Sequence, residues 1–496
     1  MSPVEPSQSQ SFPNKARVGL FLAPLLGGLV YFLPFTNLPH AAHILAGILT
    51  WVVVSWVTEA LPLAITSLLG AALCVLAGLG SVTTVFATFA HPIIFLFIGS
   101  FFLAEAFVAH GVDHRFAVWL LSMKRINGSP AGLFLALACA TAFLSMWISN
   151  TAAVAIMVPM VLGILSIVRK TEKSPGQYEI GALLLLAYSA AAGGIATVIG
   201  TPPNLIGVGL LSQQANINIS FFQWLSFGLP LSLIMLVLIS VVLKKLYPLP
   251  PVMPALWEHV RALKDEQGYW TRGQINTCVG LAVAVCCWVG PGLLGAVIGR
   301  DADVVNWLNS RLPKELVPIF AAGLLFVLPV NWKAGEFTLN WKQASHINWG
   351  TILLFGGGLT FGHLMVQTGL ASAIGEGMVR FLGSNTLWNL TAVGIVTALI
   401  LTEIASNTAA ASMLVPVVIA IAQAADVSPV PPTLGVCLAG SLAFVLPVST
   451  PPNAIVYGTG LIPLGHMIRA GLLLDLIGGC LVWLTLWILC PLLGLS

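Results

Sequence analysis

LSMWISNTAAVAIMVPM at residues 144–160 decides the fold, because Ser149-Asn150-Thr151 interrupts a stretch that is otherwise almost entirely apolar. The same interruption occurs in LTEIASNTAAASMLVPV at residues 401–417, where Ser406-Asn407-Thr408 follows 257 residues after the first copy (406 − 149 = 257). Ser, Asn and Thr favour helix caps and turns over helix interiors. Each copy therefore predicts a break inside a long apolar segment.

A second motif is also present twice. Thr201-Pro202-Pro203-Asn204 lies in VIGTPPNLI, and Thr450-Pro451-Pro452-Asn453 lies in PVSTPPNAI, 249 residues later (450 − 201 = 249). Interrupted apolar segments at corresponding positions in two halves of a chain are the best sequence pointer to the binding site of a secondary transporter. The two duplicated motifs together predict such a site.

The composition places the chain in a lipid bilayer. Hydrophobic residues make up 58% of its 496 residues and charged residues only 7%, whereas about a quarter of an ordinary soluble domain is charged. A net charge of +3 is too small to indicate nucleic-acid binding. The eight cysteines lie in apolar runs without metal-ligand spacing, so we expect them to be reduced core residues.

Membrane-spanning helices need about 20 apolar residues each. The candidate spans are 18–35, 42–57, 62–80, 92–121, 180–211, 221–245, 275–297, 315–330, 348–382, 433–460 and 468–492. Residues 1–16 are polar and rich in Pro and Ser, which predicts a disordered tail, and the first helix is expected within 17–41. The predicted fold class is an all-α polytopic membrane protein with about 11 transmembrane helices.

Two further apolar stretches, 130–168 and 388–424, are too long for one span, and each contains one Ser-Asn-Thr motif. Each fits a re-entrant hairpin of two half-membrane helices that enters and leaves on the same side. Segments 180–211 and 433–460 are predicted to be helices broken at the TPPN motifs. Irregular backbone at membrane depth is tolerated only where protein or water surrounds it, so the breaks of both hairpins should line a cavity.

Positive charges indicate the side of the membrane on which each hairpin opens. The bases that flank it are Lys124, Arg125, Arg169, Lys170 and Lys173. The second hairpin has Arg380 as its nearest base. By the positive-inside rule, the first hairpin opens to the cytoplasm and the second to the outside.

Two similar parts of opposite orientation follow from this assignment. Residues 42–245 and 275–492 are predicted to form an inverted repeat, joined by a cytoplasmic linker at 246–274 that contains a short amphipathic helix. The N-terminus would be cytoplasmic and the C-terminus outside, in a plasma (inner) membrane.

The broken segments favour binding of an anion together with a cation. Asn, Ser and Thr side chains offer donors and acceptors, and the N-termini of half-helices carry positive partial charge. Exposed backbone carbonyls at the same breaks suit sodium. No Lys, Arg or His occurs in 141–160, 195–210, 398–418 or 445–460.

A dianion in such a site would need bound cations to offset its charge. Carrying two negative charges into a cell at about −100 mV also costs roughly 4.6 kcal/mol, which calls for a driving ion. A neutral substrate is the competing explanation for a pocket without bases.

Other classes of protein fit less well. The sequence contains no HExxH or GxSxG motif and no pair of aspartates at active-site spacing, so we do not expect an enzyme. No organic cofactor is expected. Re-entrant hairpins also occur in channels, so topology alone does not separate a channel from a carrier.

The residues match a known family over roughly residues 18–492. The chain resembles the divalent anion:sodium symporter family of dicarboxylate, citrate and sulfate carriers. The resemblance lies in WVTEALPLAITSLL (56–69), in FLFIGSFFLAEAFVAHGVDHRFAVWLL (95–121), in WGTILLFGGGLTFGHLMVQTGLASAIG (349–375), and in both copies of the two motifs.

The resemblance implies a homodimer with a fixed scaffold and a transport domain that moves as an elevator. It implies sodium-coupled symport of C4-dicarboxylates such as succinate, malate and fumarate. The implied substrate-binding residues are Asn150, Thr151, Asn407 and Thr408, with Thr201, Thr450 and Pro451 nearby. The implied sodium-binding residues are Ser145, Ser149, Asn150 and the backbone of Gly200 for one ion, and Thr402, Asn407 and the backbone of Ser449 for the other.

Departures from the family pattern leave other substrates and modes open. Ala153 and Ala410 stand where many relatives have Thr, and Ser449 stands where Ala or Gly is common. Uncharged Ser145 and Thr402 favour sodium symport over exchange. A dicarboxylate or citrate exchanger without sodium and a sulfate or thiosulfate symporter both stay open as functions.

Three acidic residues lie at or near membrane depth: Glu59, Glu105 and Glu403. Glu403 adjoins the second Ser-Asn-Thr motif, whereas the corresponding residue of the first half (403 − 257 = 146) is Met146. We expect Glu403 to bond to exposed hairpin backbone, with tuning of protonation as the competing role. Glu59 is expected to hold a helix end.

Overall fold

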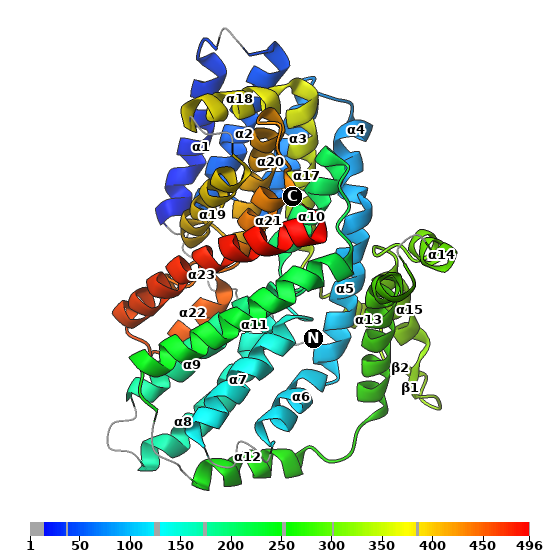
Figure 1. The fold of residues 1–496 in the computed structure, drawn as a ribbon, viewed down its shortest axis with the longest axis vertical. Coiled ribbons are helices and arrows are strands. Elements are labelled where there is room, and N and C mark those ends of the chain that lie inside the picture. The colour runs from blue at the N-terminus through cyan, green and yellow to red at the C-terminus, as the bar shows by residue number, and fades with distance from the viewer. Residues whose placement is uncertain are drawn as a thin grey trace, which may run out of the picture.

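A computed structural model describes residues 14–35, 38–123, 129–171, 176–249, 254–299, 302–382 and 386–495. The fold is almost entirely helical (Figure 1). The elements up to the middle of the chain are α1 (Asn14–Phe32), α2 (His40–Thr58), α3 (Leu63–Leu76), α4 (Val82–Ala87), η1 (Thr88–Ala90), α5 (Pro92–Ala109), α6 (Val112–Leu121), α7 (Pro130–Ser145), α8 (Asn150–Thr171), α9 (Gly176–Gly194), α10 (Pro202–Ala215), α11 (Phe221–Leu246) and α12 (Pro254–Glu266).

The second half follows a similar succession. Its elements are α13 (Arg272–Ile298), α14 (Asp303–Arg311), α15 (Val317–Val327), β1 (Pro329–Asn331), β2 (Glu336–Phe337), α16 (Trp341–Ala344), α17 (Trp349–Thr368), α18 (Leu370–Leu382), α19 (Leu387–Ile404), α20 (Asn407–Ala424), α21 (Val430–Ala439), α22 (Pro451–Gly458) and α23 (Leu464–Leu493). The two short strands pair antiparallel. Figure 1 shows α1, α2, α3 and α18 at one end of the long axis and α12 at the other.

Within the described part of the chain, ten helices are long and apolar enough to cross a membrane. They include α8, α19 and α20, which are arms of the predicted hairpins. The expected spans 62–80 and 315–330 are the shorter helices α3 and α15. The fold class is the predicted one, an all-α polytopic membrane protein.

Each Ser-Asn-Thr motif ends one helix and begins the next. Ser149 Oγ accepts a hydrogen bond from Ala152 N at 3.2 Å, and Ser406 Oγ accepts one from Ala409 N at the same distance. A serine that bonds the third following amide is an N-cap. The motif therefore starts α8 and α20 in the middle of an apolar stretch.

Each TPPN motif restarts a helix after an irregular segment. Proline is compatible with the first turn of a helix, where its missing N–H is not needed, and it follows Thr201 and Thr450 at the starts of α10 and α22. The asparagine of each motif then ties the irregular segment together. Asn204 Nδ2 donates to the carbonyls of Gly194 (3.1 Å) and Thr197 (2.8 Å).

Asn453 makes the same pair of bonds in the second half. Its Nδ2 donates to the carbonyls of Ala443 (2.9 Å) and Leu446 (3.0 Å). Both asparagines are buried. Since buried carbonyls without a partner are costly, these two amides stabilise both breaks.

Two predicted spans are divided in the structure. Segment 92–121 becomes α5 and α6, with Gly111 at a φ of 65°, and segment 348–382 becomes α17 and α18, with Gly369 at a φ of 79°. Glycine adopts this left-handed conformation without steric cost and commonly ends helices. An apolar run can therefore contain a turn that its hydropathy does not indicate.

The predicted tail at 1–16 is wrong at its end, since α1 begins at Asn14. Ala16 is buried, and Lys15 Nζ lies 2.8 Å from a carboxylate oxygen of Glu59. These contacts order the start of the helix. Residues 1–13 lie outside the described residues.

The first helix ends earlier than the predicted limit of 41, and α2 already begins at His40. Glu59 is the C-cap of α2 and has a φ of 52°, so it does lie at a helix end. The predicted linker 246–274 contains α12, and α13 begins within it because Thr271 and Gln274 form a capping box. The bases Lys124, Arg125 and Lys173 lie outside the described residues.

Replacing either bridging asparagine by alanine should destabilise the protein. Asn204→Ala or Asn453→Ala removes two hydrogen bonds and leaves the carbonyl of Gly194 or Ala443 unpaired, which costs about 1–3 kcal/mol for that group. The expected result is a lower melting temperature of the purified protein in detergent. Asn218→Ala, at an exposed residue that only accepts from Ser212 Oγ, is the control and should melt like the wild type. Equal melting of all three variants would contradict the stabilising role.

Candidate functional site

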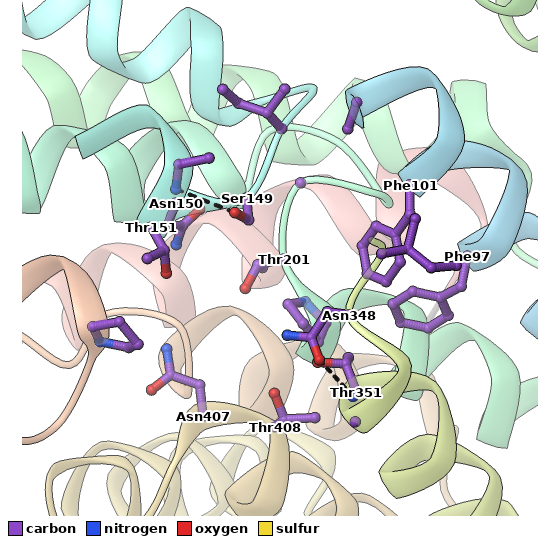
Figure 2. A pocket seen from close by; sticks show the side chains of 18 of the residues that line it. Phe97, Phe101, Ser149, Asn150, Thr151, Thr201, Asn348, Thr351, Asn407 and Thr408 are labelled. Atoms are coloured by element: carbon purple, nitrogen blue, oxygen red, sulfur yellow. Dashed lines mark hydrogen bonds between the residues drawn. The ribbon is translucent and has the colours of Figure 1, made fainter. Parts of the chain in front are cut away.

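A cavity of about 640 Å³ lies where the four breaks meet. All seven residues predicted to bind substrate line it: Asn150, Thr151, Thr201, Asn407, Thr408, Thr450 and Pro451. Figure 2 shows the first Asn-Thr pair on one side and the second on another, with Thr201 between them. Residues more than 250 positions apart in the sequence thus form one wall.

Besides α3, whose first residue Leu63 lines the cavity, five helices begin at this cavity. The first residues of α8, α10, α20 and α22 are among the lining residues, and α17 begins between the lining residues Asn348 and Gly350. The N-terminal N–H groups of a helix are not bonded within the helix and carry positive partial charge. Their convergence makes the cavity suited to anions, although no Lys or Arg is among the lining residues that the structure describes.

The asparagine of the first Ser-Asn-Thr motif accepts a hydrogen bond from a residue that does not line the cavity. Ser145 Oγ donates to Asn150 Oδ1 at 2.6 Å, and Ser145 itself is completely buried. Thr197 Oγ1 donates to the carbonyl of Met146 at 2.7 Å, which joins the hairpin to the irregular segment after α9. The hairpin and the broken helix are therefore one unit on this side of the cavity.

The second motif repeats this arrangement. Thr402 Oγ1 lies 2.8 Å from Asn407 Oδ1 and 2.6 Å from the carbonyl of Gly440, and Thr402 is completely buried. Ser145 and Thr402 are separated by the same 257 residues as the motifs (402 − 145 = 257). The two halves thus hold their asparagines by the same hydroxyl-to-amide contact.

The residues predicted to bind sodium fall into two groups. Ser149, Asn150, Gly200, Asn407 and Ser449 line the cavity, whereas Ser145 and Thr402 lie behind it. Hydroxyl, amide and carbonyl oxygens are ligands that hard cations prefer. The residues brought together in each half are chemically suited to sodium.

Glycine allows the close packing of the first cluster. A Cβ at Gly200 would lie 2.5 Å from the carbonyl oxygen of Gly194, and a Cβ at Gly194 would lie 2.6 Å from Asn150 Oδ1. Real Cβ atoms do not approach other heavy atoms so closely. The backbone of the broken helix therefore contacts the asparagine amide directly.

The opposite wall of the cavity was not predicted from sequence. It includes Phe97, Ser100, Phe101 and Glu105 of α5, and His346, Asn348 and Thr351 at the start of α17. Asn348 caps α17, with Oδ1 accepting from Thr351 N at 3.0 Å (Figure 2). Two signals were present in the sequence: Glu105 is an acidic residue near membrane depth, and Asn348 lies at a capping position directly before a long apolar run.

Two of these residues give the cavity titratable groups. Glu105 and His346 line it from α5 and from the segment before α17. Ser100 Oγ is buried and has no hydrogen-bond partner among the described residues. Hydroxyl, carboxyl and imidazole groups thus face the Ser-Asn-Thr motifs across the cavity.

A family model described as the sodium:sulfate symporter transmembrane region matches residues 14–494. The chain belongs to this family. It is therefore a membrane transporter rather than an enzyme.

Curated relatives are similar over nearly the whole chain. A sodium-dependent dicarboxylate transporter, SdcS, of Staphylococcus saprophyticus is 31% identical, with 98% of this chain and 93% of the relative covered. An uncharacterized transporter of Haemophilus influenzae is 33% identical, with 91% and 93% covered. The solved structure of the Alcanivorax borkumensis YdaH transporter has a TM-score of 0.53 at 16% identity and covers 82% of this chain and 87% of its own. That likeness concerns the fold alone.

Filling the space behind the first asparagine should stop transport by this family member without unfolding it. In Gly194→Ala, the new methyl group displaces the Asn150 amide, which is the end of a side chain and can move. A misplacement of about 1 Å can cost roughly 100-fold in rate, so we expect uptake of a labelled dicarboxylate or sulfate into proteoliposomes to fall by about that factor.

Gly458→Ala in α22 is the matched control, because nothing lies within 4 Å of its added Cβ. It should transport like the wild type. Wild-type uptake by Gly194→Ala would contradict the proposed contact with Asn150.

Proposed function

We propose that the chain is a secondary active transporter that carries C4-dicarboxylates such as succinate, malate and fumarate together with sodium. The observation that carries this proposal is the convergence of two equivalent asparagines and five helix N-termini on one cavity without Lys or Arg among its described lining residues. The names of the staphylococcal relatives point to the same coupling ion and substrate class.

Each carboxylate of the substrate would meet one Ser-Asn-Thr motif. Asn150 and Thr151 would donate to one group and Asn407 and Thr408 to the other, at the starts of α8 and α20. Thr201, Thr450 and Pro451 line the same cavity between and beside them. Two equivalent donor sets suit a molecule with two equivalent anionic ends.

Sodium would supply the positive charge that the side chains do not. One ion would be bound by Ser145, Ser149, Asn150 and the backbone of Gly200. The other would be bound by Thr402, Asn407 and the backbone of Ser449. Asn150 and Asn407 are each among both the proposed sodium-binding residues and the proposed substrate-binding residues. Bound sodium would therefore orient the amide that the substrate contacts, and the binding of sodium and of substrate would be coupled.

The mode of transport and the assembly are further parts of this proposal. The matching bonds of the two halves support an inverted repeat of 42–245 and 275–492, with a cytoplasmic N-terminus. The hairpins and broken helices would move together as the transport domain of an elevator, in a homodimer in the plasma membrane. The bonds that join each hairpin to its broken helix support movement as one body.

Sulfate is the competing substrate, because the family model is named for it. A tetrahedral anion would contact both motifs at once only if the cavity closed around it. Transport of citrate, and exchange without sodium, also compete with sodium-coupled dicarboxylate symport.

Uptake of radiolabelled succinate into proteoliposomes tests the proposed function. With an inward sodium gradient we expect accumulation in vesicles that contain no succinate, and with an equal potassium gradient we expect none. Uptake that ignores sodium but requires internal dicarboxylate would indicate an exchanger. Sodium-driven uptake of sulfate but not of succinate would show that the substrate assignment is wrong and that the sodium coupling is right.

Removing either asparagine amide should abolish uptake. Asn150→Ala and Asn407→Ala each remove an oxygen from an ion set and a donor from a substrate set, so we expect uptake to fall at least about 100-fold. Both proteins should still insert and elute as the wild type does. Asn218→Ala, outside the cavity lining, is the control, and wild-type rates in the two site variants would exclude this assignment.

A further inference from the structure

A half-buried carboxylate stabilises the break in the second half. Glu403, at the end of α19, accepts hydrogen bonds from Val445 N and Leu446 N, each at 3.0 Å. It also accepts from Ser449 Oγ at 2.5 Å. Both oxygens of Glu403 are thus occupied by the irregular segment that leads to the second TPPN motif, and not by the hairpin backbone that the sequence led us to expect.

The first half has no equivalent of this group. Met146 occupies the position of Glu403 and Gly200 that of Ser449 (449 − 249 = 200). In that half the link between hairpin and break is the bond from Thr197 Oγ1 to a backbone carbonyl. At these two positions the second half therefore has a carboxylate and a hydroxyl where the first half has a thioether and a glycine.

The bond to Glu403 determines which way the Ser449 hydroxyl points. A hydroxyl has one proton and two acceptor lone pairs. Glu403 Oε2 is the nearer of the two acceptors of this proton, and the carbonyl of Leu446, at 3.0 Å, is the other. The Oγ lone pairs are then available to a cation, and Ser449 lines the cavity.

A second acid faces the same break but makes a different contact. Asp475 of α23 is buried and accepts from Phe444 N at 3.4 Å. Its other carboxyl oxygen, Oδ1, has no hydrogen-bond partner among the described residues. Asp475 therefore bonds to the backbone of the same break and interacts with the side chain of Glu403.

We propose that Glu403 orients Ser449 so that its hydroxyl oxygen joins the second sodium site, which gives this site a side-chain oxygen at the position where the first site has Gly200. Glu403 is a positioning residue in this scheme. This inference rests on the proposed sodium coupling.

Sodium binding by the purified protein tests the inference without transport. The probe is sodium chloride alone, titrated against potassium chloride at constant ionic strength, with the melting temperature as readout. For the wild type we expect sodium to raise the melting temperature by mass action. Loss of one ligand in Ser449→Ala should raise the half-maximal sodium concentration about 3- to 30-fold.

Glu403→Gln should raise the half-maximal sodium concentration by a similar factor. A glutamine amide has only one acceptor oxygen, so it cannot accept hydrogen bonds at both positions that the carboxylate oxygens occupy. The double variant should shift less than the sum of the two single variants, since both changes remove the same oriented hydroxyl. If Glu403→Gln does not fold, Ser449→Ala decides alone.

Ser310→Ala and Glu376→Gln are the matched controls. Ser310 Oγ bonds only within α14 and is exposed, and Glu376 pairs with Arg380 on the exposed face of α18. Both should titrate like the wild type. An unchanged sodium midpoint in Ser449→Ala would overturn the inference while leaving sodium coupling intact. A wild type that does not respond to sodium at all would overturn the coupling and the inference together.

Discussion

Backbone that leaves a helix inside a bilayer must find its hydrogen-bond partners within the protein, and the rest of this structure depends on how two asparagines meet that constraint. Asn204 and Asn453 each donate both amide protons to carbonyls of the irregular segment that precedes them. Those bonds allow a helix to stop and restart at membrane depth. Without them, the starts of α10 and α22 would not be available to a ligand.

The same constraint explains the chemistry of the cavity. Four helices restart at the breaks and a fifth, α17, begins opposite them, so the cavity is surrounded by unbonded N–H groups and positive helix ends. Such groups bind anionic groups without a buried base, whose desolvation is costly. The hydroxyl and amide oxygens that hold the breaks then serve a cation. Anion and cation sites arise from the same interrupted helices, and this common origin is a physical basis for coupling them.

The duplicated motifs were sufficient to predict the fold class and the principal wall of the cavity. Their residue types carry the information locally: an N-capping serine, a proline in the first turn and an amide after it. Most of the opposite wall was not predictable, because residues such as Ser100 meet the motifs only through packing of distant helices. The divisions at Gly111 and Gly369 were missed because hydropathy does not register a left-handed glycine. The start of α1 depends on the pairing of Lys15 with a residue of another helix.

The central claim is that substrate and sodium occupy the cavity together, and the affinity for succinate as a function of sodium concentration tests it most directly. Isothermal titration of the purified protein would give this affinity over a range of sodium chloride at constant ionic strength. Two sodium ions bound with each substrate predict that the logarithm of the association constant rises with the logarithm of sodium concentration, with a limiting slope of about two. An affinity that does not change with sodium would contradict the account.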